Sequence, residues 1–491
     1  MQNSLLSATL ASLLLLGSLQ AEESIDDDLG GFDVEEVTAS NDDLAGFGEE
    51  EDDALDGFGD DTEEETSSVV AVEETQTPSN FSFAGNIAFK TAYGYRSHTV
   101  DNTNYQGFNQ AQTALYLQAD YKINSDWKMR ISGDTFYDAI YDLRDQPYND
   151  DVLDTYRTQL RLDDTYIQGR ITRDIDIKIG RQVVVWGKSD SIRVTDVINP
   201  LDNRNPGLTD IEDLRLPTTM AKLDYYIGKW NLSAMVIGES RIFLEAAPYS
   251  EYFPVDVVFP TAPPQGQFFA LKQATTSWDN TQYAFAANGV FSGWDLSFYG
   301  ADVFDSKWHI EGTTPQNTAR VVSKIKMLGS AVNVATGSWL LKGEVAYVSG
   351  IRYNSTQDDK DRLDTLVGVD YMGISDTVLS VEFVNRHIFD YETKMASITA
   401  AKPDYTDQNE YQTALRVTST FMNDSLNANA LLSMFGASWE YGGFARVWVA
   451  YDVMDGVNAN VGFVDYLDGE RPFAAAIQNN DKVFADITYS F

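Results

Sequence analysis

The sequence predicts an all-β protein, a transmembrane antiparallel β-barrel of about 18 strands, with 16 also acceptable, that follows a disordered acidic tail. Three observations lead to this fold class. From Asn80 onward apolar residues alternate with polar ones in strands of about ten residues, the length that crosses a bilayer when tilted. The connections alternate between short and long, as in outer-membrane barrels. The last such strand ends on an aromatic residue, Phe491.

Composition excludes several classes of protein. None of the 491 residues is Cys, which rules out disulfides, thiolate metal sites and Cys nucleophiles. The mean hydropathy is −0.29, and beyond residues 1–21 no apolar run approaches the roughly 20 residues of a membrane helix, so a helical membrane protein is excluded. The formal net charge of −40 would repel phosphate backbones, so we expect no nucleic-acid partner.

Residues 1–21 are predicted to be a secretory signal peptide. Leu10–Leu16 form its apolar region and Ala21 is a suitable cleavage position, although no Lys or Arg precedes them and Leu19 is bulky for its place. The alternative is a retained N-terminal helix, which would be too short to span a membrane.

Residues 22–79 are predicted to form a disordered tail. Residues 22–74 hold 23 Asp and Glu and no Lys or Arg, so the segment cannot bury enough apolar surface to offset chain entropy. The pattern Asp-[Asp/Ala]-Leu-x-Gly-Phe nevertheless occurs three times, 15 and then 11 residues apart. We expect its apolar residues to bind a periplasmic or inner-membrane pump component: Leu29, Phe32, Leu44, Phe47, Leu55 and Phe58. The alternatives are a duplicated acidic spacer without a partner and loose divalent-cation binding by the carboxylates.

The barrel is predicted to span residues 80–491. In its first strand Phe81, Phe83, Ile87, Phe89 and Tyr93 share one face, which we expect to contact the lipids of the outer membrane. Short connections include 124–126, 228–229, 292–293, 336–337 and 423–424, and long ones include 138–156, 187–218, 239–280, 305–318, 388–408 and 467–480. Short turns face the periplasm in such barrels, so an even strand number puts both ends of the barrel on the periplasmic side.

Basic residues lie opposite the apolar faces of the third to fifth strands: Lys128, Arg130, Arg157, Arg161 and Lys178. Neighbouring strands would align them as a lumenal ladder that attracts anions. The alternative is local pairing with Asp134, Asp163 and Asp176, which would stabilise the barrel without selecting ions.

The segment 180–218 has the most unusual pattern in the barrel. Residues 180–187 (G-R-Q-V-V-V-W-G) are predicted to end a strand, and the following residues mix apolar and charged side chains. A loop of this composition is expected to fold into the lumen and narrow it, with Asn199-Pro200 at a turn. The candidate constriction residues are Trp186, Asp190, Asp196, Asn199, Pro200 and Asp202. The alternative is a loop packed on the outer rim of the barrel.

The same segment carries a family resemblance. Its pattern G-R-Q-x-V-x-W-G-x-x-D, followed by D-x-x-N-P-x-D, resembles a proteobacterial family of outer-membrane barrels of unknown function, over Gly180 to Leu216. In architecture the chain is similar to barrels of the alginate-export type. The resemblance implies a barrel that works beside inner-membrane pumps of the resistance–nodulation–division type, which are predicted to move lipids or other hydrophobic molecules.

Three further features bear on function. Loop 239–280 is rich in aromatic residues and Pro, which indicates either a contact or ligand surface or a lid over the barrel mouth. The three His residues, His98, His309 and His387, lack metal-ligand spacing, so no metal site or cofactor is expected, and no nucleophile motif indicates an enzyme. Ile487, Tyr489 and Phe491 share one face of the last strand and resemble the C-terminal signal that barrel-assembly machinery reads.

Together these features predict an outer-membrane channel of a Gram-negative bacterium. It would pass a small amphipathic or hydrophobic molecule as the partner of an export system, with loop 187–218 as its constriction and the acidic tail in the periplasm. A general or anion-preferring diffusion porin is the first alternative. A surface or scaffolding protein that uses the barrel only as an anchor is the second.

Overall fold

The computed structural model describes residues 80–258, 268–272, 274–312, 318–397 and 403–491. The predicted signal peptide and the acidic tail, including its repeated Leu and Phe residues, lie outside these ranges. All that follows concerns the described part of the chain.

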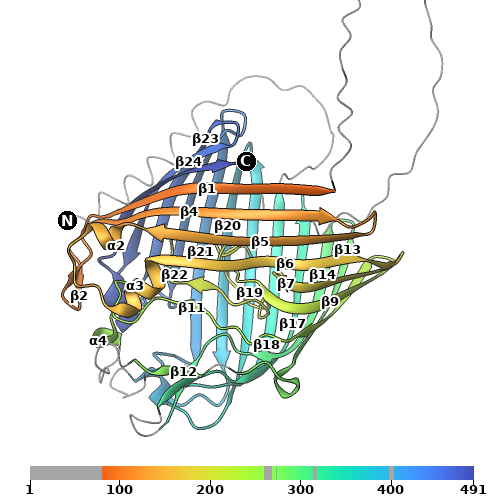
Figure 1. The fold of residues 1–491 in the computed structure, drawn as a ribbon. Coiled ribbons are helices and arrows are strands. Elements are labelled where there is room, and N and C mark those ends of the chain that lie inside the picture. Colours follow the sequence, from red (N-terminus) through yellow and green to blue (C-terminus); the bar gives the residue numbers. More distant parts are fainter. Residues whose placement is uncertain (1–79, 259–267, 273, 313–317, 398–402) are drawn as a thin grey trace, which may run out of the picture. The chain divides into compact units, whose positions relative to one another are not determined.

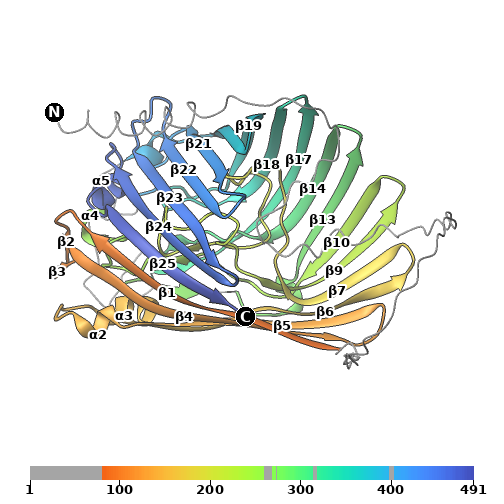
Figure 2. The same cartoon turned by 90° about the horizontal axis from the view of Figure 1, so that it is seen from above.

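Eighteen antiparallel strands form one sheet (Figure 1). Each strand pairs with the next along the chain, and β1 (Phe81–Gly94) pairs with β25 (Lys482–Ser490) to close the ring, seen from above in Figure 2. The predicted 18-stranded barrel is therefore confirmed. The other strands of the wall are β4 (Gly107–Lys122), β5 (Trp127–Asp138), β6 (Thr158–Thr172), β7 (Ile175–Gln182), β9 (Thr218–Ile227), β10 (Trp230–Ile237), β13 (Gln282–Phe291), β14 (Trp294–Phe304), β17 (Lys324–Thr336), β18 (Trp339–Ile351), β19 (Lys360–Ile374), β20 (Thr377–Ile388), β21 (Asn409–Phe421), β22 (Leu426–Phe435), β23 (Gly443–Met454) and β24 (Val457–Leu467).

Strand β1 shows why such residues form a barrel wall. The apolar side chains predicted to face lipid are 43–53% exposed, whereas Ala88 and Ala92 on the opposite face are buried. Exposed apolar and aromatic side chains recur on the outer faces of the other strands, where a bilayer would contact them. Among the described residues no helix is both long and apolar enough to cross a membrane.

The connections sort by length to the two ends of the barrel. Turns of two to four residues, such as 228–229 and 292–293, lie at one end, as predicted. The long connections lie at the other end and carry the small elements, several of which are labelled in Figure 1. These are α2 (Ile140–Leu143), α3 (Asp150–Tyr156), α4 (Val255–Val258), α5 (Pro472–Ile477), the 3-10 helices η1 (Trp278–Asn280) and η2 (Thr393–Ala396), and the short strands β2 (Thr99–Val100), β3 (Thr103–Asn104), β8 (Asp202–Asn203), β11 (Leu244–Glu245), β12 (Ala270–Lys272), β15 (His309–Glu311) and β16 (Ala319–Val321).

Strand β7 ends earlier than the sequence pattern indicates. We expected the strand to reach Gly187, but its ladder with β6 stops at the pair Thr165–Arg181, and β7 ends one residue later. Gly180 has a φ of +136°, and a Cβ atom there would lie 2.2 Å from the carbonyl oxygen of Thr165. Glycine is therefore required one pair before the ladder with β6 ends. Residues 183–217 form the loop that follows.

Candidate functional site in the barrel lumen

Loop 183–217 lies inside the ring of strands, where its yellow-green trace is visible in Figure 2. Asn199 holds the two ends of this loop together. Its side-chain oxygen accepts a hydrogen bond from the N–H of Val184 (2.8 Å), and its amide donates to the carbonyls of Gln182 (3.2 Å) and Leu216 (2.9 Å). Asn199 and the following Pro200 are buried and line neither of the cavities described below. Both residues therefore shape the loop from within.

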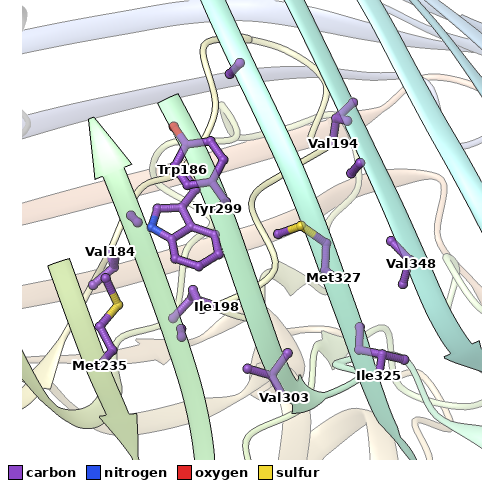
Figure 3. Packing of buried hydrophobic residues seen from close by; sticks show 14 of the residues in the cluster. Val184, Trp186, Val194, Ile198, Met235, Tyr299, Val303, Ile325, Met327 and Val348 are labelled. Carbon is purple, nitrogen blue, oxygen red and sulfur yellow. The ribbon is translucent and has the colours of Figure 1, made fainter. Parts of the chain in front are cut away.

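The first half of the loop packs against the wall through an apolar core (Figure 3). Trp186 is 4% exposed and stacks on Tyr299 of β14, with 4.9 Å between the ring centroids. Ile192 and Val194 belong to the same core. The wall contributes inward-facing residues from β9 to β21, among them Met220, Met235, Val303, Met327 and Val348. On this side the lumenal face of the wall is apolar, and the loop covers it.

Two carboxylates of the wall bind the loop backbone. Glu344 of β18 accepts hydrogen bonds from three N–H groups of residues 188–195 and from the Thr195 hydroxyl, at 2.5–3.3 Å. Glu382 of β20 accepts two N–H groups of the same stretch and the Ser189 hydroxyl, at 2.7–3.1 Å. Both carboxylates are buried, where a charge without such donors would be costly. They therefore anchor the loop to the wall.

Ion pairs tie the loop to further strands. Asp190 pairs with Lys342 of β18, whose amino group also lies 2.7 Å from a carboxylate of β19. Asp210 lies between Arg416 of β21 (3.1 Å) and Arg446 of β23 (3.0 Å). The loop is thus held from several sides of the ring, and it crosses the lumen between them.

Two of the predicted constriction acids are neutralised by arginines of the loop itself. Asp196 lies 3.2 Å from the guanidinium of Arg193 and 2.8 Å from that of Arg215. Asp202 lies 2.5 Å from the guanidinium of Arg204. These pairs fix the loop's conformation and offset the negative charges of Asp196 and Asp202.

Two cavities flank the loop in the lumen. Segment 201–211 lies between them, because five of its residues line one cavity and four line the other. The smaller, about 400 Å³, is mainly polar; its wall includes Lys90, Asp134, Gln159, Arg161, Lys482 and Asp486. The larger, about 780 Å³, sets apolar side chains beside arginines; its wall includes Ile192, Ile351, Ile388, Arg193, Arg362 and Arg386.

A second segment, 246–258 of the aromatic-rich loop, also contacts inward-facing residues of the wall. Tyr252 is 1% exposed, and its ring meets that of Tyr466 in β24 edge-on at 5.9 Å. Glu251 lies 2.6 Å from the amino group of Lys482 in β25. Residues 259–267 and 273 of this loop lie outside the described ranges. Segment 246–258 is packed against the wall, whereas Trp278, near the end of the same loop, is 92% exposed.

The basic residues predicted to form a ladder are engaged with neighbouring acids. Arg161 lies 2.7 Å from Asp134 and 2.8 Å from Asp163, as the local-pairing alternative expects. Arg130 lies 2.8 Å from Asp120 of β4. Such pairs stabilise the wall and leave less charge for ions in the lumen.

Arg157 does not lie on a strand, so its place in the ladder is corrected. It caps the C-terminus of α3, which occupies the residues before β6, and its nearest acid is Asp142 at 3.8 Å. Lys178 of β7 places its amino group 4.0 Å from the ring centroid of Tyr166, and Lys128 is half-buried on β5. The five bases therefore do not form one continuous row.

The C-terminal residues of the chain help to close the ring against β1. Ile487, Tyr489 and Phe491 are 49–51% exposed on the outer face. Phe491 exchanges two backbone hydrogen bonds of 2.9 Å with Gly85 of β1, and its ring centroid lies 6.2 Å from that of Phe83. That barrel-assembly machinery recognises Ile487, Tyr489 and Phe491 stays a prediction.

The three His residues lie at the long-loop end and do not meet. His98 follows β1, His309 begins β15, and His387 is near the end of β20. Burial lowers the pKa of His98. Within the described ranges no group of three or more His, Asp or Glu side chains is arranged to hold a metal ion.

Asp481, in the connection before β25, is a buried carboxyl at the same end. It pairs with Arg96 and accepts a hydrogen bond from the N–H of Tyr466 at 2.8 Å. Burial, followed by the charge of Asp465, raises the pKa of Asp481 to about 7 in spite of the guanidinium of Arg96.

Sequence reasoning missed the wall residues that hold the loop: Lys342, Glu344, Glu382, Arg416 and Arg446. A partial signal exists, because each alternates with apolar neighbours, which marks an inward-facing position of a strand. Their partners are up to 236 residues away in the chain, so no local pattern could pair them with the loop.

Solved structures similar to this chain are membrane-type barrels at low sequence identity. OccAB3 of Acinetobacter baumannii is 12% identical, with 84% of this chain and 99% of that chain covered and a TM-score of 0.50. OccAB2 of the same species is 11% identical (84% and 98% covered, TM-score 0.48). The outer membrane protein opdK of Pseudomonas aeruginosa is 11% identical (84% and 99% covered, TM-score 0.46). At such identities the likeness concerns the fold alone.

No curated protein matches the sequence. One family does, and its match begins at residue 4, within the predicted signal peptide, and runs to residue 491. The expected membership in a family of unknown function is confirmed, whereas the similarity to alginate-export barrels stays a prediction. With almost its whole length matched, the chain belongs to the family described as Protein of unknown function (DUF1302).

Proposed function

We propose that this protein is an outer-membrane channel that passes small amphipathic or hydrophobic molecules. The observation that carries the proposal is the larger cavity, which lies inside a closed barrel and sets Ile351 and Ile388 beside Arg193 and Arg386. A site with apolar walls and a few charged groups suits a molecule with an apolar body and one charged end. The apolar outer face of the wall supports placement in the outer membrane of a Gram-negative bacterium.

Loop 183–217 is the constriction in this proposal. It crosses the lumen, it is anchored to the wall by Glu344 and Glu382, and its segment 201–211 stands between the two cavities. Passage from one cavity to the other would therefore require the loop to move or the molecule to pass beside it. The proposed role as partner of an export system rests on the family resemblance and on the repeated Leu and Phe of the acidic tail.

A deletion tests the constriction. Removing residues 190–212 should raise the single-channel conductance of the purified protein in planar bilayers, because the loop then no longer fills the lumen. Heat-modifiable migration in gels shows whether the barrel of the variant is folded. A folded variant with the conductance of the wild type would rule the constriction out, and a wild type and variant that both fail to conduct would favour a barrel that serves only as an anchor.

A flux assay tests the cargo. Liposomes containing the protein should release a fluorescent long-chain carboxylate faster than a neutral sugar of similar mass, relative to protein-free liposomes. Equal rates for both would favour a general diffusion porin. An anion-preferring porin is the second possibility, which a reversal potential set by chloride would support.

A further inference from the structure

One seam of the barrel wall is interrupted. The ladder between β6 and β7 begins at the pair Thr165–Arg181. Residues 158–162 of β6, before that point, pair with β5 but with no residue of β7 or of any other described strand. In an antiparallel strand the N–H and C=O groups of successive residues point alternately to the two neighbouring strands. About half of the backbone groups in this stretch therefore point toward β7, where no strand pairs with them.

The interruption is built into the sequence pattern that begins at Gly180. The ladder ends one residue after this glycine, and residues 183–186 pair with no residue of β6. Arg181, the residue after the glycine, partly closes the seam. Its guanidinium donates to the carbonyl of Leu162 (3.1 Å) and pairs with Glu239 (2.8 Å), which in turn accepts the N–H of Thr219 (3.0 Å). One side chain therefore links β6 to the far side of β7.

The seam lies at the level of the membrane. Tyr137 of β5 pairs with Thr158, the first residue of the stretch, and aromatic residues on the outer face mark the membrane boundary of such barrels. Within that boundary Leu160 of β6 is 88% exposed, and Val185, in the segment that follows β7, is 60% exposed. Leu160 pairs with β5 on one side, but no described strand pairs with it on the β7 side.

The smaller cavity lies directly behind the seam. Gln159 and Arg161, on the inner face of the same stretch, line it together with Asp202 and Arg204 of the loop. A backbone edge is not tolerated against hydrocarbon unless polar groups satisfy it. A polar cavity behind the edge, and an apolar surface in front of it, provide what an amphipathic molecule needs at each of its ends.

We propose that the seam between β6 and β7 is a lateral opening between the lumen and the membrane, kept closed by the Arg181–Glu239 pair. Amphipathic molecules leave or enter the barrel through it, with the polar group in the smaller cavity and the apolar part in the lipid. This inference rests on the proposed function for its cargo, but the opening itself can be tested without any cargo.

Reactive cysteines test the opening, since the chain has no Cys of its own. Val184→Cys lies in the apolar core just after β7, and Val348→Cys is its matched control in the same core, on the fully paired β18. Each variant in liposomes is treated with pyrene maleimide dissolved in the bilayer and, separately, with a charged maleimide in water. The ratio of lipid-side to water-side labelling should be at least about tenfold higher for Val184→Cys, because local opening of the seam exposes it to lipid. Equal ratios would overturn the opening.

A cross-link tests passage. Leu160→Cys with Val185→Cys, joined by a short bifunctional thiol reagent, should lower flux of the fluorescent carboxylate several-fold and leave ion conductance unchanged. The control pair is Val345→Cys with Thr365→Cys, which face each other across the intact β18–β19 ladder. Equal flux after both cross-links would overturn the lateral route.

Two other outcomes are distinct. Disulfide-linked dimers of the single variant Leu160→Cys in membranes would show that a second copy covers the edge, and would overturn the opening. If the wild-type protein does not transport the fluorescent carboxylate but the cysteine variants show the expected labelling ratio, the proposed cargo is refuted and the opening remains supported.

Discussion

Replacing Glu344 by Gln should release the constriction loop. In the native chain one carboxylate oxygen accepts the N–H groups of Lys188 and Ser189, and the other accepts the N–H and the hydroxyl of Thr195. Glutamine keeps one of these oxygens and turns the other into a donor, so two hydrogen bonds are lost. A hydrogen bond to a charged group contributes roughly 1.5–3 kcal/mol, so the loss of two destabilises the docked loop by roughly 3–6 kcal/mol, which is about 100-fold or more in population.

Single-channel recording is the assay for this variant. Glu344→Gln should show more frequent openings to a high-conductance level, and that level should match the conductance of the 190–212 deletion. The control is Glu311→Gln, which removes an exposed carboxylate of β15 that does not touch the loop. If Glu344→Gln is folded and records like the wild type, Glu344 does not hold the loop in place and the reasoning is wrong.

Three further predictions follow from single groups or segments. The folded state retains the Asp481 proton up to a pH near 7, whereas the unfolded chain loses it near its ordinary pKa, so the stability from that proton is present at low pH and lost between about pH 4 and pH 7. Over this range the protection of the Tyr466 amide against hydrogen exchange, measured relative to an unfolded amide at the same pH, should fall in the wild type and stay constant in Asp481→Asn. Arg161→Gln should lower the temperature at which the barrel unfolds, because it removes the cation between Asp134 and Asp163. The double variant Arg161→Gln with Asp163→Asn should keep the reversal potential of the wild type. A shifted reversal potential in this double variant would support the basic ladder. Substituting Phe32, Phe47 and Phe58 by Ser, with every charge kept, should abolish recovery of a periplasmic or inner-membrane partner while barrel assembly and conductance persist, and equal recovery from both proteins would count against the tail as a docking segment.

The strands were predictable because their signal is local. A residue such as Phe83 or Ile87 faces lipid whatever the distant parts of the chain do, since side chains alternate across every strand. The short turns and long connections follow from where that alternation stops. Arg157 shows the limit of the method: a short helix, α3, interrupts the pattern just before β6, and the alternation was extended one residue too far.

The interior was not predictable in the same way. The sequence by itself determined an alternating chain long enough for 18 strands and a loop too apolar to stay in water, whereas the early end of β7 was not predicted. Only the tertiary structure decided that Glu344 and Glu382 accept hydrogen bonds from the loop backbone and that Asp210 lies between Arg416 and Arg446. The same holds for the stretch of β6 that has no partner on its β7 side. The physical reason is that these contacts join residues far apart in the chain, and closing the ring is what brings their strands to face the same loop.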